Sequence, residues 1–188
     1  MRLNTRSALV AGAVEIYDDA IYNVAEIVAY LRRRGDWGDA QVGVGEGIRM
    51  ESRRNNRVAF FNPLEFTCPP ILRDFASTVW HYLNDYGQRF EVGFGGMEPV
   101  NVNEYAPGEF YKPHSDDGPG QARVISALVY LNDVAEGGHT EFVHHGVSVS
   151  PKAGRLIIFP SNYAYAHAAH PPISGTKYSA AFWTTRQQ

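Results

Sequence analysis

The second half of the chain consists of short strand-like runs, and this pattern restricts the fold more than any other feature of the sequence. The runs are short and are separated by Gly, Pro, Asn or Asp, which favour turns. The runs cover residues 97–105, 124–133, 139–143, 147–150, 154–161, 163–170 and 177–185. Short strands with this spacing are typical of a sandwich, a barrel or a jelly roll. We predict a double-stranded β-helix, that is, a cupin-like jelly roll.

The first half of the chain carries helical patterns. Apolar residues three or four apart run from Ile21 to Leu31, with Asp18 and Asp19 before them and Gly35 behind them. Acidic residues at the start and a glycine at the end indicate a helix, here of about four turns. A second apolar pattern spans residues 70–86, and short strands are expected at 7–14 and 58–61. We therefore predict a mainly β, α+β protein whose N-terminal helices pack on one face of the jelly roll.

The chain has 188 residues, an ordinary size for one domain with its own core. We expect a single domain over residues 1–188, in which 1–96 supply the helical support and a substrate loop and 97–185 form the jelly-roll core. Residues 35–58 are rich in Gly, Arg and Asn and are predicted to be this loop. Its arginine-rich run, 51–57, forms either a solvated edge or a cover over a substrate, and Arg54 is the candidate contact to that substrate.

Composition excludes several functional classes. A formal net charge of -3 argues against broad electrostatic binding to nucleic acid or to an anionic membrane. No apolar stretch reaches the roughly twenty residues of a membrane span. Cys68 is the single cysteine, so no disulfide can form within the chain, and we expect a cytoplasmic protein.

His114 and Asp116, within the stretch YAPGEFYKPHSDD at 105–117, are the first candidates for chemistry. Residues two apart in an extended strand share a face, so these two side chains can point at one metal ion. A second imidazole would complete the set of two histidines and one carboxylate that is typical of non-haem Fe(II) oxygenases. A late strand of a jelly roll would bring His167 or His170 alongside, and position alone does not choose between them.

Several further stretches now resemble a known family, the Fe(II)- and 2-oxoglutarate-dependent dioxygenases, and within it the prolyl 4-hydroxylase-like branch. The resemblance covers roughly residues 97–185. It rests on 105–116, on Arg123 and the run after it, on EGGHTEF at 136–142, on 147–161, and on HAAHPPISGTKYSAAFW at 167–183. In that branch a basic residue follows the distal histidine by ten positions, a glycine stands two before the basic residue, and a tryptophan often stands six after it. Gly175, Lys177 and Trp183 fit His167 in this way, whereas His170 has no such partners.

The resemblance implies a role for each candidate residue. His114, Asp116 and His167 would hold Fe(II), and Lys177 would bind the distal carboxylate of 2-oxoglutarate. Further contacts to 2-oxoglutarate are expected from Thr140 and from Tyr105 or Tyr111, although each tyrosine can equally be a core aromatic. Trp183 would line the substrate entrance, or pack on the last strand. O2 would be the second co-substrate, with ascorbate as a possible reductant, and the carboxylate of Asp116 favours hydroxylation over halogenation.

Three functions are compatible with these residues. The first is hydroxylation of a prolyl residue in a peptide or protein, with succinate and CO2 as co-products. The second is the same chemistry on a small molecule such as a free amino acid. The third is a non-catalytic, metal-binding jelly roll, which would be expected to lack one of the ligands or the basic residue.

Overall fold

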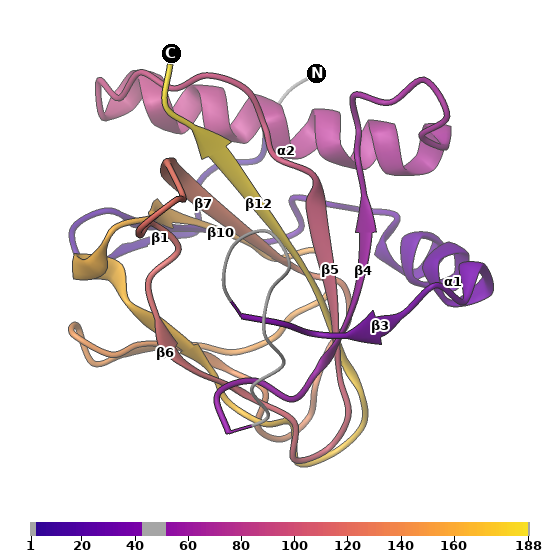
Figure 1. The fold of residues 1–188 in the computed structure, drawn as a ribbon. Helices are drawn as coiled ribbons and strands as arrows, with labels where there is room; N and C mark the ends of the chain where they lie inside the picture. The colour runs from indigo at the N-terminus through magenta and orange to yellow at the C-terminus, as the bar shows by residue number, and fades with distance from the viewer. Residues whose placement is uncertain (1–2, 43–51, 188) are drawn as a thin grey trace.

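The structure, a computed structural model, describes residues 3–42 and 52–187. The described residues form a larger and a smaller antiparallel sheet, with helices on the outer face of the larger one (Figure 1). The larger sheet has the order β1-β2-β10-β7-β12-β5-β4-β3, and the smaller sheet the order β6-β11-β8-β9. The larger sheet contains β1 (Ala8–Val10), β2 (Val14–Tyr17), β3 (Gly38–Asp39), β4 (Arg57–Phe61), β5 (Val100–Tyr105), β7 (Arg123–Tyr130), β10 (Leu156–Pro160) and β12 (Lys177–Thr185). The smaller sheet contains β6 (Tyr111–His114), β8 (Thr140–Phe142), β9 (Val147–Val149) and β11 (His167–Ala169).

The strands of the two sheets form the jelly roll that the sequence predicts, and the mainly β fold class is confirmed. Phe142 of the smaller sheet packs with Val14, Tyr130 and Phe159 of the larger one, so apolar contacts hold the sheets face to face at one side. At the other side the sheets enclose a cavity, which contains the candidate site.

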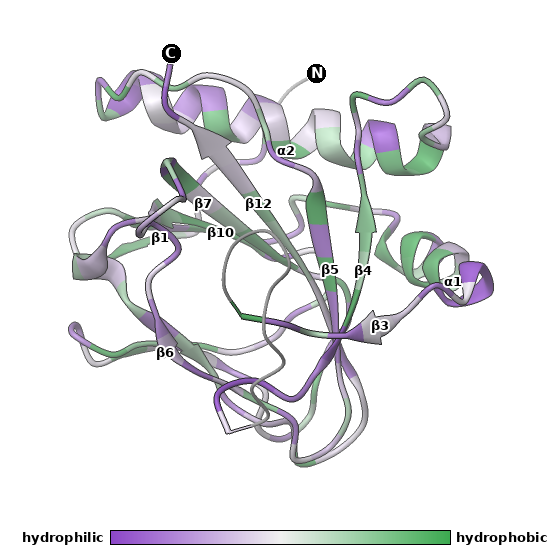
Figure 2. Ribbon diagram, viewed as in Figure 1, coloured by the Kyte–Doolittle hydropathy of each residue, from purple (hydrophilic) through white to green (hydrophobic). Residues whose placement is uncertain are grey.

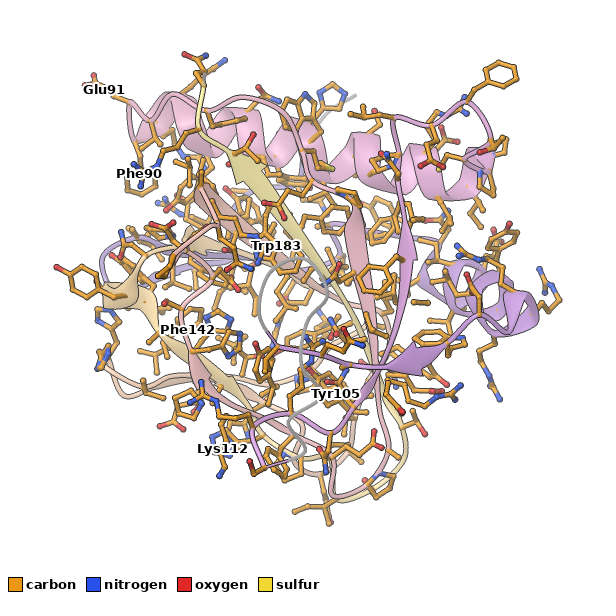
Figure 3. All side chains as sticks on the ribbon, viewed as in Figure 1. Phe90, Glu91, Tyr105, Lys112, Phe142 and Trp183 are labelled. Atoms are coloured by element: carbon orange, nitrogen blue, oxygen red, sulfur yellow. The ribbon has the colours of Figure 1, made fainter. Side chains whose placement is uncertain are left out.

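Residues alternate along the central strands between a helix-facing side and a cavity-facing side. In β12, Tyr178, Ala180 and Phe182 belong to the main apolar core, whereas Lys177 and Trp183 line the cavity. Successive side chains of a strand point to opposite faces, so each central strand supplies both the core and the site. Tyr105 and Trp183 lie below α2 in the view of Figure 3, on the side of the larger sheet that faces the cavity.

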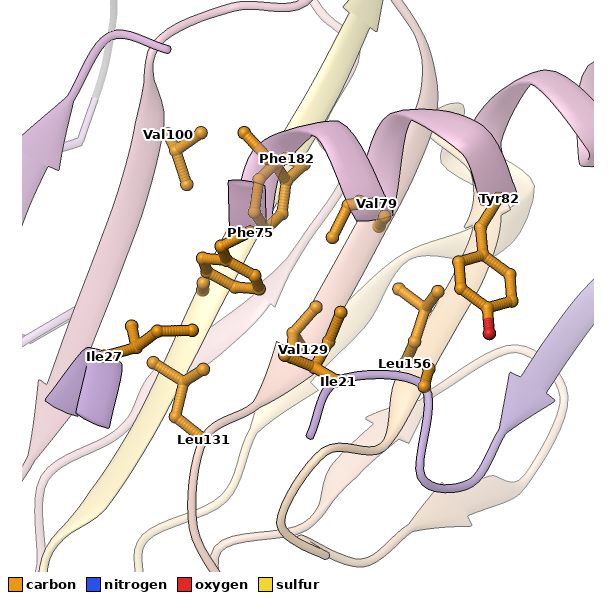
Figure 4. Close-up of a cluster of buried hydrophobic side chains, with 14 of the residues drawn as sticks. Ile21, Ile27, Phe75, Val79, Tyr82, Val100, Val129, Leu131, Leu156 and Phe182 are labelled. Carbon is orange, nitrogen blue, oxygen red and sulfur yellow. The ribbon is translucent and has the colours of Figure 1, made fainter. Parts of the chain in front are cut away.

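Helix α2 (Pro70–Arg89) covers the outer face of the larger sheet. It begins after Pro69, with a proline at its first position, where a missing N–H costs nothing. Its apolar stripe includes Phe75 and Val79, and Phe75 meets Phe182 of β12 edge to face with ring centroids 5.1 Å apart (Figure 4). The hydropathy colours show apolar residues recurring along β4, β7 and β10, and mixed colours along α2 (Figure 2).

Helix α1 (Val24–Arg34) begins later than the sequence indicates. The expected start at Asp18 is wrong, because Asp18 pairs with Arg155 at 2.6 Å and the backbone N–H groups of Ala20 and Ile21 donate to the carbonyl of Gly154. Ile21 is therefore a core residue outside the helix. At the other end Gly35 adopts a left-handed conformation with φ 71°, which ends the helix as expected.

Three smaller expectations also differ from the structure. Residues 7–14 do not form one strand, because Ala11 and Gly12 have positive φ and turn the chain between β1 and β2. Residues 163–170 begin with a 3-10 turn, η1 (Tyr163–Tyr165), and only β11 is a strand. The expected loop at 35–58 contains β3 and the start of β4, and its residues 43–51 lie outside the described part. No helix in that part is long and apolar enough to cross a membrane.

Candidate active site

A cavity of about 540 Å³ lies between the two sheets, and nine of the residues that the sequence nominates line it. The residues come from β5, β6, β8, β11 and β12 and from the segments beside β4 and β6. They are His114, Asp116, His167, Lys177, Thr140, Tyr105, Tyr111, Trp183 and Arg54. Segments far apart in the sequence therefore meet in one cavity, and the spacing of residues along the sequence could not show this by itself.

His114, Asp116 and His167 converge at one end of the cavity. Strands β6 and β11 pair with His167 directly opposite His114, and Asp116 follows β6 by two residues. The Nε2 atoms of His114 and His167 each lie 3.8 Å from a carboxylate oxygen of Asp116. One ligand atom from each residue lies within 4.8 Å of the others, and these three form the group of potential metal ligands in the described residues.

Backbone carbonyls orient both imidazoles toward this point. Nδ1 of His114 lies 2.9 Å from the carbonyl oxygen of Lys112, and Nδ1 of His167 lies 3.2 Å from that of Tyr165. A carbonyl can only accept, so Nδ1 carries the proton and Nε2 keeps its lone pair for a metal. Burial, reinforced by the neighbouring His167, lowers the pKa of His114 and keeps its imidazole neutral, as metal binding requires.

Asp116 is buried and held by hydroxyl groups. Ser126 of β7 donates to its Oδ2 at 2.6 Å, and Ser126 lies 2.8 Å from the hydroxyl of Ser161. Burial alone would raise the pKa of Asp116, but the two imidazoles and hydrogen bonds from Ser126 and Trp183 lower it below its usual range. The carboxylate is therefore ionised and fixed in place. No local sequence pattern marks Ser126, although its place in β7 puts it on the face opposite the apolar core residues Ile125 and Ala127.

His170 lies apart from this group. It follows the end of β11, and its Nε2 lies 2.6 Å from a carboxylate oxygen of Glu141. Its ring stacks on His139, with centroids 4.1 Å apart. His144 and His145 are exposed in the turn between β8 and β9. The structure thus places His167, and not these histidines, beside His114 and Asp116.

Lys177 is a buried cation without an acidic partner in the described residues. Its side chain is 1% exposed, and its Nζ lies 5.0 Å from the ring centre of Tyr105 and 5.3 Å from that of Tyr130. Burial lowers the pKa of Lys177 to about 7. An unpaired buried charge is costly, so this position fits a ligand carboxylate. The hydroxyl of Thr140 lies in the same cavity, 2.7 Å from that of Tyr130.

Aromatic and basic side chains form the remaining walls. Tyr111 stacks on the ring of His114, with the ring centroids 3.6 Å apart. The guanidinium of Arg54 lies 4.6 Å from the ring centre of Tyr111. The guanidinium of Arg123 lies 3.7 Å from the ring centre of Trp183 and also pairs with Glu98 at 2.7 Å. Arg54 is buried, so the expected alternative of a solvated edge is wrong for this residue.

Comparison with known proteins agrees with this geometry. Residues 100–185 match the model of the 2OG-Fe(II) oxygenase superfamily. This part of the chain belongs to that superfamily. Prolyl 4-hydroxylase subunit alpha-1 of Homo sapiens is 34% identical over an alignment of length 207, which covers 89% of this chain and 38% of the relative. Prolyl 4-hydroxylase 1 of Arabidopsis thaliana is 32% identical over 113 residues, covering 46% of this chain and 40% of the relative. The chain thus spans less than half the length of these relatives.

Solved structures share the fold of the oxygenase domain. A prolyl-4-hydroxylase of Pseudomonas putida superposes with a TM-score of 0.76 at 21% identity and covers 94% of both chains. A prolyl hydroxylase of Trichoplax adhaerens, in complex with a hypoxia inducible factor peptide fragment, gives a TM-score of 0.80 at 20% identity. That match covers 93% of this chain and 84% of the neighbour. Both show the jelly roll.

Membership of this superfamily implies Fe(II), 2-oxoglutarate and O2, and the cavity fits the first two. The nitrogen and oxygen donors of His114, Asp116 and His167 are of the kind that non-haem Fe(II) oxygenases use. The buried, unpaired ammonium of Lys177 fits the distal carboxylate of a 2-oxo acid.

Ser126→Ala is predicted to weaken metal binding. Without the hydroxyl, the carboxylate of Asp116 loses a donor that fixes its orientation, and loss of such a partner typically lowers metal affinity about 10- to 100-fold. Titration of the apo protein with Co(II), followed by visible absorption, measures the effect. Ser148→Ala, an exposed serine on β9, is the matched control and should bind Co(II) like wild type. Equal affinities in the two variants would contradict the prediction.

Proposed function

We propose that the protein is an Fe(II)- and 2-oxoglutarate-dependent dioxygenase that hydroxylates a prolyl residue in a peptide or protein. One observation carries the proposal: three converging metal-type ligands and a buried, unpaired lysine line the same cavity. Fe(II) needs the first group, and the co-substrate carboxylate needs the second. A non-catalytic jelly roll has no use for both together.

In this proposal each residue has a defined task. His114, Asp116 and His167 hold Fe(II), which when bound supplies O2 activation coupled to oxidative decarboxylation of 2-oxoglutarate. Lys177 neutralises the distal carboxylate of 2-oxoglutarate. Thr140, Tyr105 and Tyr111 line the co-substrate side of the cavity. Tyr105 lies close to Lys177, Tyr111 stacks on His114, and Thr140 accepts a hydrogen bond from Tyr130, which also lies close to Lys177; these contacts support the assignments.

Trp183 and Arg54 are proposed to face the prime substrate. Trp183 lies beside Asp116, which accepts a hydrogen bond from it, so a substrate next to the metal would contact the indole. We also propose that 97–185 form the catalytic core of a single domain, with 1–96 as support. Arg54 and Gln41, from the first half, line the cavity, which favours one domain over two.

The names of the relatives support a prolyl substrate. The human and plant relatives are prolyl 4-hydroxylases, and the Trichoplax neighbour was solved with a peptide. A cytoplasmic location remains part of the proposal, on the single cysteine of the chain, Cys68.

Mass spectrometry of peptide products tests the proposed activity. Incubation with Fe(II), 2-oxoglutarate, ascorbate and a set of proline-rich peptides should give a product one oxygen atom heavier, together with succinate. If succinate forms but no peptide gains oxygen, the peptide substrate is refuted and the dioxygenase is retained. A screen of free amino acids coupled to succinate release then tests the small-molecule alternative.

The non-catalytic alternative has its own spectroscopic signature. Anaerobic addition of Fe(II) and 2-oxoglutarate should produce the weak visible charge-transfer band of the metal-bound 2-oxo acid. A wild-type protein without this band and without succinate formation would support a binding protein.

His167→Ala is predicted to reduce turnover to background, whereas His170→Ala should keep it. The first variant removes a ligand atom from the converging group, and the second removes an imidazole that pairs with Glu141 outside it. Succinate formation measures turnover, and equilibrium dialysis with Co(II) measures metal content. Loss of activity in His170→Ala with retention in His167→Ala would show that the distal ligand is wrongly assigned.

The affinity for 2-oxoglutarate is predicted to fall as the pH rises through about 7, the value to which burial lowers the pKa of Lys177. Only the protonated ammonium attracts the carboxylate, and the protonated fraction declines above the pKa. The facing Tyr105 and Tyr130 remain neutral there, because burial raises their pKa.

Lys177→Arg isolates this effect, because a guanidinium keeps its charge across the range. The Kd of this variant for 2-oxoglutarate is measured calorimetrically from pH 6 to 9, with Zn(II) in place of iron. It should lose the pH dependence near pH 7, which in wild type reflects the titration of about one proton. Lys152→Arg, on a surface pair with Asp18, is the control and should keep the wild-type dependence. An unchanged profile in Lys177→Arg would assign the dependence to another group.

A further inference from the structure

Arg54 is a buried guanidinium that borders the cavity. The residue is 8% exposed, although it lies in the polar segment before β4. Its guanidinium rests on the face of Tyr111, at 4.6 Å from the ring centre, and Tyr111 in turn stacks on His114. One aromatic ring thus separates Arg54 from a residue of the metal-type group.

The partners of Arg54 in the described residues are all neutral. Its Nε donates to Oδ1 of Asn56 at 2.7 Å, an NH1 hydrogen points to the carbonyl oxygen of Gln41 at 3.4 Å, and NH2 donates to Oδ1 of Asn103. A guanidinium has five N–H groups, so these contacts leave one on each terminal nitrogen without an acceptor among the described residues.

Two other arginines close to the cavity are neutralised, whereas Arg53, which also lines it, is exposed and points to the carbonyl oxygen of Pro113. Arg123 pairs with Glu98 at 2.7 Å, and Arg57, three residues after Arg54, pairs with Glu104 at 2.9 Å. Arg54 is more deeply buried than either and has no carboxylate in the described part of the chain. A buried charge is costly without a counter-charge, and a guanidinium binds a carboxylate through two parallel hydrogen bonds.

The charges of 2-oxoglutarate do not account for Arg54. In the proposed function one carboxylate of the co-substrate meets Lys177 and the other meets the metal. Asn103, which contacts Arg54, and Tyr105, which contacts Lys177, are two residues apart on the cavity face of β5. The two residues that the cations contact are therefore roughly 7 Å apart along the strand, and the cations occupy separate positions.

We infer that Arg54 binds a carboxylate of the prime substrate. This inference rests on the proposed function, because it assumes that 2-oxoglutarate occupies the position of Lys177. The carboxylate has two sources: an acidic side chain close to the target proline in a peptide, or the α-carboxylate of a free amino acid. Arg54 is thus a specificity-determining residue, which holds the substrate one ring away from the metal.

Binding of matched ligand pairs tests the inference. The first pair is a proline-containing peptide set with Glu at each flanking position and the same set with Gln. The second pair is L-proline and L-prolinamide. Calorimetry with protein loaded with Zn(II) and 2-oxoglutarate should show the carboxylate member of one pair binding about tenfold more tightly, as expected for a charge-assisted contact. The pair that shows the preference identifies the source of the carboxylate.

Three variants connect the preference to Arg54. Arg54→Gln should abolish the preference and leave the Kd for 2-oxoglutarate unchanged, and Arg54→Lys should keep part of it, because the charge remains but the planar fork is lost. Arg33→Gln, an exposed position on α1, makes the same change of charge and should behave like wild type. Thermal unfolding of each variant shows whether the fold is intact, and the comparison within wild type does not depend on any variant.

The inference is overturned if wild type shows no preference in either pair, or if the preference survives in Arg54→Gln. A higher Kd for 2-oxoglutarate in Arg54→Gln would instead assign Arg54 to co-substrate binding, and this result would also overturn the inference. Product analysis separates this from the proposed function: a carboxylate preference without any hydroxylated product refutes the hydroxylase, whereas hydroxylation without the preference refutes the role of Arg54.

Discussion

Side chains along the central strands alternate between two faces of the sheet, and the rest of the structure depends on this alternation. In β12 the residues on one face pack with α1 and α2, and those on the other face enter the cavity. A shift of register by one residue would place Lys177 in the apolar core and Tyr178 in the cavity. The packing of Phe75 of α2 on Phe182 therefore fixes which face of β12 meets the cavity, although neither ring lines it.

Charge separation inside the cavity follows from this arrangement. Within the described residues, Asp116 accepts hydrogen bonds from Ser126 and Trp183 and has the two imidazoles beside its carboxylate. Lys177 and Arg54 are buried without acidic partners there. Folding has to offset the cost of burying these cations, and the contacts that offset it come from the helix-covered face of the sheet. The cavity is thus electrostatically incomplete in a way that suits anionic ligands.

Much of the site could be predicted because its residues lie in short, ordered motifs. His114 and Asp116 share a strand end, and Lys177 and Trp183 have fixed offsets from His167. The first half was less predictable. Asp18 resembles a helix start, yet it pairs with Arg155, which is 137 residues away in sequence. The role of Ser126 also depends on a contact that is distant in sequence. A serine within an apolar run carries no local pattern which shows that its hydroxyl donates to the carboxylate of Asp116.

The sequence by itself determined the strand-rich second half, the alternation of its strands and the pair His114 and Asp116 as candidate ligands, because these depend on local spacing. Only the tertiary structure decided that His167 lies opposite His114 while His170 turns to Glu141, since that depends on the pairing of β6 with β11. It also decided that Arg54 is buried against Tyr111. Burial depends on what the rest of the chain packs around a residue, and no local pattern records it.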